Sequence, residues 1–212
     1  MLRLLLVDDH TLVLDSLGRL LDAEADLTVV GKAGSGHEAV RMCRELSPDL
    51  VVLDYSLPDI DGLETTRQIV ALGLPTRVLI LTMHANEEYA TRLLRAGASG
   101  FIIKAADASE LLAAIRKVGQ KGTYVSPAVM EKMVVRVGQP ADDAPEASLS
   151  DRELQVLLRL AGGQTTREVA TSLSLSISTI ETYRSRILEK LNLRNNSDLT
   201  RFAVRRGLID LD

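Results

Sequence analysis

Three features are scarce in this sequence of 212 residues: aromatic side chains, cysteine and long apolar runs. Tryptophan is absent and aromatic residues make up 3% of the chain, so an aromatic-lined pocket for an apolar ligand is not expected. No apolar run approaches the roughly 20 residues that a membrane-spanning helix needs, which predicts a protein without a membrane segment. The N-terminal apolar stretch ends at Asp8, too early for the core of a signal peptide, so export is not expected.

The chain contains one cysteine, Cys43. A single cysteine cannot form a disulfide within the chain, which is typical of proteins in a reducing compartment and predicts a cytoplasmic protein. Cys43 falls on the apolar side of a helical pattern, so we expect a packed core thiol rather than a reactive one.

A strong net charge is also missing, because the formal charge of the whole chain is −4. The first 147 residues hold 15 basic and 21 acidic side chains, and the remaining residues hold 10 and 8. An acidic part followed by a mildly basic part fits a regulated protein that binds nucleic acid. An excess of two positive charges does not by itself indicate DNA binding.

Short apolar runs alternate with helical patterns through the first 120 residues. Strands are predicted at 2–7, 27–33, 50–54, 77–81 and 100–103. Helices are predicted at 11–23, 36–46, 62–72, 87–96 and 108–120. Five strands that alternate with five helices predict an α/β domain with a doubly wound parallel sheet.

Polar side chains that suit phosphate chemistry lie at the ends of four of these strands. In chain order they are Asp8 and Asp9, Asp54, Thr82, and Lys104. Because the carboxyl ends of parallel strands share one edge of the sheet, we expect these residues to meet in one cleft. Carboxylates that lie close together need a cation, and hard oxygen ligands in an open site suit Mg²⁺. A hydroxyl and an ammonium group beside them suit the oxygens of a phosphoryl group.

These residues carry a family resemblance. D-D-H at 8–10, D-Y-S-L-P-D-I-D-G at 54–62, L-T-M-H at 81–84 and G-x-I-I-K at 100–104 resemble the receiver domain of bacterial two-component response regulators. The combined spacing is specific, whereas no single motif in it is. The resemblance implies a flavodoxin-like fold with strand order 2-1-3-4-5 and a receiver domain over residues 1–121.

The resemblance also implies roles for the residues at this edge. Asp54 is the expected phosphoacceptor, which takes a phosphoryl group from a sensor histidine kinase and loses it slowly, so the protein is not expected to be a conventional enzyme. Mg²⁺ is expected on Asp9, on Asp54 and on the backbone carbonyl of Ser56, with Asp8 bound directly or through water. Lys104 is expected to pair with Asp54 before phosphorylation and with a phosphoryl oxygen afterwards.

Two further positions correspond to the switch of that family. Thr82 is expected to hydrogen-bond another phosphoryl oxygen and to move inward when it does so. This movement would leave room for the ring of Phe101 to turn inward, which couples an electrostatic event to packing. A static core phenylalanine is the alternative at Phe101, and it stays open.

The sequence departs from the usual pattern of the family beside the switch residues. Many receivers have a proline after the lysine, in a cis peptide, where this chain has Ala105. A cis bond to alanine costs about 3–4 kcal/mol, so a trans or a strained loop is expected. Many receivers also have a small residue after the threonine, where this chain has Met83 and then His84. We expect these two side chains to narrow the access of a phosphodonor to Asp54 and to slow the loss of the phosphoryl group.

The segment after the receiver predicts a connection and a second domain. A helical pattern opens with Ser126 and Pro127 and covers 126–137. Residues 138–147 are rich in Pro, Ala and acidic residues and lack apolar periodicity, which predicts an interdomain linker within 122–147. The second domain is therefore expected over residues 148–212.

Four helices are predicted in this second domain. Ser150 and Glu153 form a capping-box pattern at the start of the first helix, which ends at Gly162. The apolar face of this helix is expected to hold Leu154, Leu157, Leu158 and Ala161. Further helices follow at 166–173, 177–192 and 197–206, the last of them just before Gly207. A short helix, a tight turn and a longer helix form the helix-turn-helix arrangement, whose second helix enters the major groove of DNA.

This part resembles the LuxR-type DNA-binding domain. The matching stretches are L-S-D-R-E-L-Q-V-L at 149–157, E-V-A-T-S-L-S-L-S at 168–176 and S-T-I-E-T-Y-R-S-R-I-L-E-K-L-N-L at 178–193. A receiver joined to such a domain is the pattern of NarL/FixJ-type response regulators, and it implies a phosphorylation-controlled transcriptional regulator that binds double-stranded DNA. One module of this size contacts few base pairs, so a homodimer on a palindrome-like site is expected after phosphorylation.

The resemblance places the DNA contacts on two helices. Base contacts are expected from Glu181, Thr182 and Ser185. Phosphate contacts are expected from Thr179, Tyr183, Arg186 and Lys190, with Ser178 on the same outward face, and from Thr165, Thr166 and Arg167 at the start of the preceding helix. The family often has a lysine in place of Glu181, and an acid repels phosphate but accepts a hydrogen bond from cytosine N4. Either Glu181 sets an unusual base preference or it is a solvated charge.

Three alternative functions fit the sequence less well. A phosphatase of the haloacid dehalogenase type needs a D-x-D spacing after its first strand, which Asp8 and Asp9 do not provide. A LuxR-type receptor for a small molecule needs an apolar and usually aromatic-rich pocket, which the low aromatic content does not favour. The third alternative keeps the fold but places it under the control of a partner protein or ligand, without phosphorylation.

Overall fold

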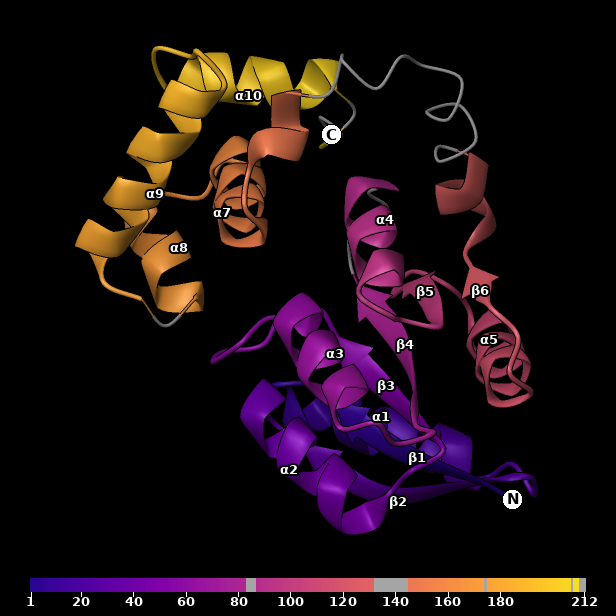
Figure 1. Cartoon of the computed structure of the whole chain (residues 1–212). Coiled ribbons are helices and arrows are strands. Elements are labelled where there is room, and N and C mark those ends of the chain that lie inside the picture. The colour runs from indigo at the N-terminus through magenta and orange to yellow at the C-terminus, as the bar shows by residue number, and fades with distance from the viewer. Residues whose placement is uncertain (83–86, 132–144, 174, 207, 210–212) are drawn as a thin grey trace. The chain divides into compact units, whose positions relative to one another are not determined.

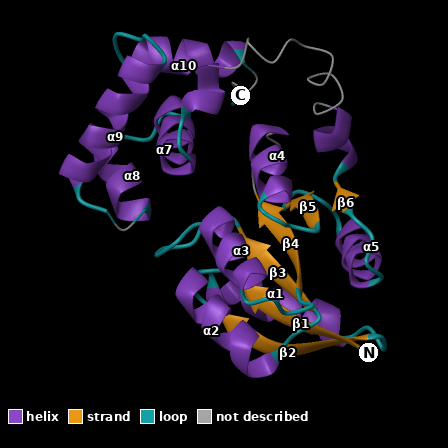
Figure 2. Ribbon diagram, in the orientation of Figure 1, coloured by secondary structure: helices purple, strands orange, loops and turns teal. Residues whose placement is uncertain are grey.

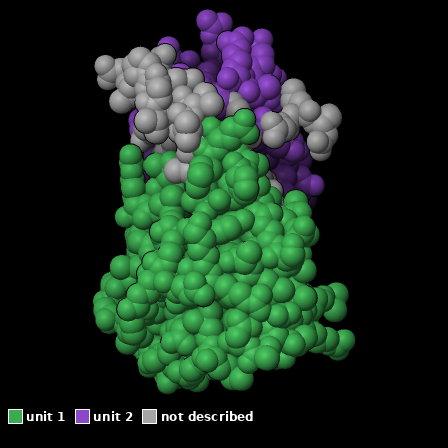
Figure 3. Space-filling model, turned by 90° about the vertical axis from the view of Figure 1, so that its right-hand side faces the viewer, with its two compact units in different colours: residues 1–133 green, residues 134–212 purple. Residues whose placement is uncertain are grey.

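The computed structural model describes residues 1–82, 87–131, 145–173, 175–206 and 208–209, and for residues 87–89, 147 and 151 it describes only the backbone. The chain divides into two compact units, residues 1–133 and residues 134–212 (Figure 3). Each unit has buried apolar residues of its own and is described separately. Within the described ranges, every helix falls short of the length and apolar character that crossing a bilayer demands.

The first unit is built around a parallel sheet (Figure 1). Its strands are β1 (Leu2–Val7), β2 (Leu27–Ala33), β3 (Leu50–Asp54), β4 (Arg77–Thr82), β5 (Gly100–Ile103) and β6 (Tyr124–Val125). Their order is β2-β1-β3-β4-β5-β6, so the winding of the chain reverses beside β1. In a doubly wound sheet this reversal opens a crevice at the carboxyl ends of the central strands, and ligands bind there.

Helices cover both faces of the sheet (Figure 2). They are α1 (Thr11–Asp22), α2 (Gly36–Leu46), α3 (Gly62–Ala71), α4 (Glu87–Arg95) and α5 (Ala108–Gly119). α1 and α5 share one core with inward-facing residues of β1, β3, β4 and β5. On the opposite face α2 packs against α3, and α3 packs against α4. All residues of β3 are buried, as expected for a central strand of a sheet covered on both sides.

The predicted elements of this unit agree with the structure to within one residue at each end, but the expected number of strands is one too few. β6 was not predicted because two residues are too short to show periodicity. It joins the edge of the sheet through the backbone N–H of Tyr124, which donates to the carbonyl of Ser99. Residues 127–131 are helical, as the pattern at Ser126 and Pro127 predicts. Residues 132–137 of that predicted helix and 138–144 of the predicted linker lie outside the described residues.

The second unit consists of helices. They are the 3₁₀ helix η2 (Pro145–Ser148), α7 (Asp151–Ala161), α8 (Thr166–Ser172), α9 (Ile177–Lys190) and α10 (Asn196–Arg205). The predicted capping box is confirmed, because the Ser150 hydroxyl accepts from the N–H of Glu153 and the Glu153 carboxylate accepts from the N–H of Ser150. Gly162 follows the last residue of α7, as predicted. Gly207 lies outside the described residues.

α7 forms the centre of this unit, where it contacts α8, α9 and α10. The four apolar residues predicted for its inner face are buried, and Val156 and Leu160 are buried as well. The predicted apolar face was therefore too narrow, because helices pack around α7 on several sides. α9 contributes Ile180 and Ile187 to this core.

Candidate functional site

The carboxyl ends of β3, β4 and β5 bring together residues that lie far apart in the sequence. Asp54 ends β3, and the backbone N–H of Tyr55 after it donates to the carbonyl of Leu81 in β4. Thr82 ends β4, and its carbonyl accepts the backbone N–H of Lys104 just after β5. The sheet therefore fixes the predicted acceptor, hydroxyl and ammonium residues at one edge.

Lys104 joins a carboxylate of β3 to one that follows β1. Its Nζ lies 2.6 Å from Asp8 Oδ2 and 3.1 Å from Asp54 Oδ2. The exposed fractions of the three side chains are 17% for Lys104, 2% for Asp8 and 6% for Asp54. Burial alone would lower the pKa of Lys104, but the two carboxylates raise it above its ordinary value, so the side chain is cationic. One ammonium group thus faces two buried carboxylates.

Asp54 is an acid in surroundings that disfavour its charged form. Burial raises the pKa of Asp54 to about 6; Lys104 acts in the opposite direction and Asp8 in the same direction. The backbone N–H of Ser56 hydrogen-bonds the Asp54 carboxylate. A second cation beside Asp54 would favour the carboxylate form.

Asp8, Asp9 and His10 form an acidic cluster beside this pair. His10 lies directly before α1, and its Nδ1 is 2.8 Å from Asp9 Oδ1 and 3.1 Å from Asp8 Oδ1. The carboxylate of Asp9, and then that of Asp8, raise the pKa of His10. One potential ligand atom from each of the three residues lies within 4.8 Å of the others. Mg²⁺ prefers oxygen ligands, and the carboxylates of Asp8 and Asp9 supply them. Asp9 is partly exposed, so an ion could reach this cluster from solvent.

The predicted switch residues lie in the interior of the first unit. Thr82 and Phe101 are both buried, Phe101 completely. Because side chains alternate along a strand, Phe101 points away from the α1 and α5 core to which Ile102 belongs. Burial of the ring fits a static core residue and also the inward state of a switch. The peptide after Lys104 is trans. Met83 and His84, the residues predicted to limit phosphodonor access, lie outside the described residues.

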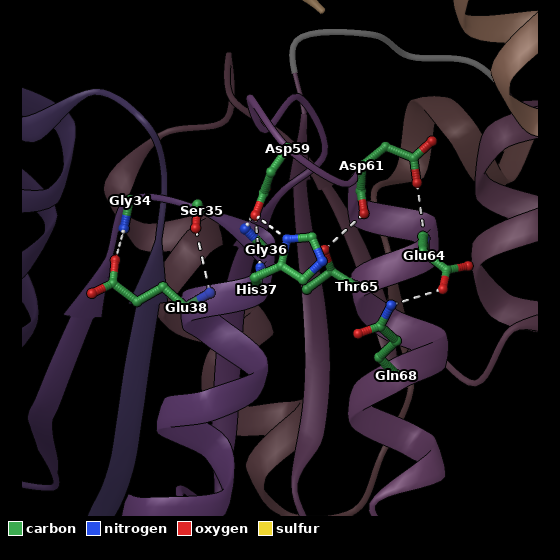
Figure 4. A network of polar contacts seen from close by, with 10 residues as sticks. All are labelled: Gly34, Ser35, Gly36, His37, Glu38, Asp59, Asp61, Glu64, Thr65 and Gln68. Atoms are coloured by element: carbon green, nitrogen blue, oxygen red, sulfur yellow. Dashed lines mark hydrogen bonds and ion pairs between the residues drawn. The ribbon is translucent and has the colours of Figure 1, made fainter. Parts of the chain in front are cut away.

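The loop after Asp54 is held to α2 by Asp59 (Figure 4). Asp59 Oδ1 accepts the backbone N–H of Gly36 at 2.8 Å, and Oδ2 accepts that of His37 at 2.9 Å. The same Oδ2 lies 2.7 Å from His37 Nδ1. Partial burial alone would raise the pKa of Asp59, but the N–H groups of His37, Gly36 and Ile60 hold it well below its usual range. A carboxylate is favoured there because the N-terminus of a helix carries unpaired N–H groups.

α2 and α3 pack closely on either side of this loop. Asp61 caps α3, since its carboxylate accepts the backbone N–H of Glu64 at 2.8 Å, and its carbonyl accepts the hydroxyl of Thr65 at 2.8 Å (Figure 4). A Cβ on Gly36 would lie 2.5 Å from Ile60 Cγ1 and would also collide with Thr65 Oγ1. The sequence indicates no partner for Asp59, because Gly36 lies 23 residues away. The loop of residues 55–61 after Asp54, here called the acceptor loop, is thus held by the contact between Asp59 and the start of α2. Periodicity and local motifs in the sequence do not reveal this contact.

α9 presents a polar face to solvent in the second unit. Ser178, Glu181, Thr182, Ser185 and Arg186 are exposed on it, whereas Thr179, Tyr183 and Arg184 are half-buried. An open hollow on this helix is lined by Ser178, Thr179, Thr182, Tyr183 and Arg186. All five lining residues belong to the set predicted to contact DNA, so the structure brings these predicted residues together on one surface.

The start of α8, which packs against α9, holds three further predicted contacts. Thr165 caps this helix, and its hydroxyl donates to Glu168 Oε2 at 2.8 Å. Glu168 also accepts the backbone N–H of Thr165 at 2.7 Å. Arg167 is exposed and Thr166 is half-buried. The backbone N–H of Thr165 at this end of α8 therefore already has an acceptor within the protein, the carboxylate of Glu168.

Two charged residues of the set predicted to contact DNA, Glu181 and Lys190, form ion pairs within the protein. Glu181 Oε2 lies 3.3 Å from Arg184 Nη1, and Arg184 Nε donates to Asn196 Oδ1 of α10 at 2.6 Å. Lys190 Nζ lies 2.6 Å from Glu153 Oε2 of α7. The sequence alone does not indicate that Asn196 of α10 and Glu153 of α7 bind these side chains.

Comparison with known proteins matches both units. Residues 4–116 match the family described as response regulator receiver domain, and residues 147–203 match the bacterial regulatory proteins of the luxR family. The chain is 40% identical to the response regulator GacA of Pseudomonas protegens over 99% of each protein. It is 37% identical to the response regulator UvrY of Escherichia coli, over 100% of this chain and 98% of that protein. A solved two-component response regulator of the LuxR family from Aurantimonas sp. SI85-9A1 is 35% identical, with a TM-score of 0.63, over 66% of this chain and 99% of that one.

Proposed function

Because this chain belongs to the response regulators of the NarL/FixJ type, which join a receiver domain to a LuxR-type DNA-binding domain, we propose that phosphorylation of Asp54 controls its binding to promoter DNA. The observation that carries the proposal is the position of Lys104 between the buried carboxylates of Asp8 and Asp54. A purely structural ion-pair network would balance its charges, because an uncompensated buried charge is costly. Phosphoryl chemistry with a bound cation accounts for the imbalance.

In the proposed reaction, a carboxylate oxygen of Asp54 attacks the phosphorus atom of the donor, a sensor histidine kinase. The bond from phosphorus to the donor breaks as the bond to Asp54 forms. The transition state of phosphoryl transfer is loose, so positioning and neutralisation of charge do most of the work. Lys104 Nζ, at 3.1 Å from Asp54, is placed to bind one phosphoryl oxygen, and Thr82 would hydrogen-bond another. Movement of Thr82 would then be coupled to the position of the Phe101 ring.

Mg²⁺ would be held by Asp9, Asp54 and the backbone carbonyl of Ser56, with Asp8 as a direct ligand or a ligand through water. The buried carboxylates outnumber the one lysine beside them, which is the charge balance that a divalent cation completes. When bound, the ion would supply positive charge against the phosphoryl oxygens. Met83 and His84 would narrow the access of the phosphodonor, and substitution of Met83 by alanine should then shorten the lifetime of the phosphorylated protein.

On DNA, α9 would lie in the major groove. Glu181, Thr182 and Ser185 would contact base edges, with Ser178 beside them on the face toward DNA. Phosphate contacts would come from Thr179, Tyr183, Arg186 and Lys190 and, at the start of α8, from Thr165, Thr166 and Arg167. Lys190 would have to share its ammonium group with Glu153. A homodimer formed after phosphorylation would bind a palindrome-like site, and the protein would act in the bacterial cytoplasm, where the chromosome lies.

The test is binding to genomic DNA fragments, with and without Mg²⁺ and acetyl phosphate, for the native chain and for Asp54→Asn. We expect the donor to tighten binding in the native chain and to leave the variant unchanged. Equal responses of both chains would remove Asp54 from its role as the switch. Equal binding with and without donor would instead favour control of the same DNA-binding domain by a partner protein or ligand.

A further inference from the structure

An acidic side chain lies within an otherwise uncharged row on α9. Ser178, Thr182 and Ser185 are exposed and carry hydroxyl groups, and Glu181 is exposed among them with 48% of its side chain accessible. A carboxylate on a helix that meets DNA is repelled by phosphates. An acid is tolerated on such a surface when its charge is balanced and its oxygens face a hydrogen-bond donor on a base.

The negative charge of Glu181 is balanced by Arg184, three residues further along the helix. Its Nη1 lies 3.3 Å from Glu181 Oε2, while its Nε donates to Asn196 Oδ1 at 2.6 Å. Asn196 is the first residue of α10, so the guanidinium group is fixed between two helices. Only 28% of the Arg184 side chain is exposed, and its planar fork leaves little freedom once two donors are engaged.

Stability alone does not account for this arrangement, because an exposed ion pair three residues apart on a helix contributes little to folding. The arrangement does restrict the position of Glu181. One carboxylate oxygen, Oε2, is bound to Arg184, and the structure gives Oε1 no partner among the described residues.

We infer that Arg184 and Asn196 are positioning residues that neutralise Glu181 and direct its second oxygen toward a base edge, where it accepts a hydrogen bond from the exocyclic amino group of cytosine. This inference rests on the proposed binding of α9 to DNA. Cytosine is the base that a carboxylate selects in the major groove, since its N4 amino group is a donor there. Arg184 acts on sequence preference through Glu181, not through a phosphate.

The test is selection from a randomised double-stranded DNA library by the full-length chain with Mg²⁺ and acetyl phosphate, followed by affinity measurements at several salt concentrations. The variants are Glu181→Gln, Arg184→Gln, Asn196→Ala and Asn196→Asp, and Arg186→Gln on the same helix is the matched control. Far-UV circular dichroism of each variant establishes that it is folded.

The native chain should prefer cytosine at one position of each half-site by about 5- to 100-fold. Glu181→Gln should shift that preference toward adenine, because a glutamine amide pairs with adenine. Arg184→Gln and Asn196→Ala should reduce the preference about 5-fold or more at that position alone, and Asn196→Asp should keep it because an acceptor for Arg184 remains. The control Arg186→Gln should weaken binding to all sequences and lower the salt slope by about 0.9, as expected for one lost phosphate contact.

Two results would overturn the inference. One is an unchanged base preference in Glu181→Gln. The other is a loss of affinity in Arg184→Gln that is uniform over sequences and accompanied by a smaller salt slope, which would make Arg184 a phosphate contact. Failure of the native chain to select any sequence would instead contradict the proposed DNA binding itself.

Discussion

Lys190 of α9 lies 2.6 Å from Glu153 of α7, measured between Nζ and Oε2. The same Oε2 accepts the backbone N–H of Ser150 at 2.7 Å, so one carboxylate completes the capping box of α7 and also binds across to α9. Burial alone would raise the pKa of Glu153, but Lys190 and Ser150 lower it below its ordinary value. The C-terminal end of α9 is thereby fixed to the start of α7, and the predicted phosphate contact has a structural role.

Replacing Lys190 by methionine should lower the free energy of unfolding by about 1–3 kcal/mol. The substitution leaves a buried carboxylate with no cation, but Lys190 is 39% exposed, so the loss falls between the values for surface and buried pairs. Urea denaturation of Lys190→Met, Glu153→Gln and the double variant would give the coupling energy. Arg186→Gln, on the exposed face of the same helix, is the control and should leave stability within about 0.5 kcal/mol. A coupling energy near zero would show that the pair contributes nothing.

Replacing Lys104 by methionine should destabilise the receiver unit by about 3 kcal/mol without metal, because no ammonium group then lies between the buried carboxylates of Asp8 and Asp54. Urea denaturation in EDTA measures this loss, and adding Mg²⁺ should recover part of it. Lys32→Met is the matched control. Lys32 pairs with Asp15 at 2.7 Å on the surface, and removing that pair should cost less than about 1 kcal/mol. Equal losses in the two variants would mean that the buried carboxylates do not depend on Lys104.

The stability contributed by Asp59 should depend on pH. The pKa of Asp59 is lowered in the folded state, so its contribution is fully present above the ordinary value of 3.8 and is lost as pH falls below it. Asp59→Asn should therefore cost about 1.5–3 kcal/mol at pH 7, the usual range for a hydrogen bond to a charged group, and the difference from the native chain should shrink below pH 4. Urea denaturation of the native chain and the variant at pH 7 and below pH 4 measures this difference. Asp15→Asn, at a solvent-exposed ion pair, serves as the control. A difference that stays constant down to pH 2 would contradict the role of the charge.

Gly36 and Gly34 offer a matched pair for the packing beneath the acceptor loop. A Cβ on Gly36 would meet Ile60 and Thr65, so Gly36→Ala should cost about 1–3 kcal/mol through overpacking. A Cβ on Gly34 would meet nothing within 4 Å, and Gly34→Ala should be close to neutral. Thermal denaturation of both variants would measure the contrast. Similar melting temperatures would show that α2 and α3 move apart at little cost.

The agreement between sequence and structure is closest where a pattern is local. Alternation of apolar runs with helical periodicity gave β1 and β3 with their observed bounds, because strand and helix periods are properties of neighbouring residues. The capping box at Ser150 was equally local, since both partners lie within four residues. β6 was not predicted, because its two residues show no pattern of their own. They form a strand only because they pair with the edge of β5.

By itself, the sequence determined which residues reach the carboxyl edge of the sheet, since a strand that ends at Asp54 or Thr82 delivers that residue to the shared edge of any parallel sheet. Only the tertiary structure decided which of those residues meet which. It placed Lys104 closer to Asp8 than to Asp54, Asp59 on the N-terminus of α2, and Lys190 on Glu153. The reason is physical: strand and helix formation depends on near neighbours, whereas the partner of a charged side chain depends on how separate elements pack and on which groups that packing removes from water.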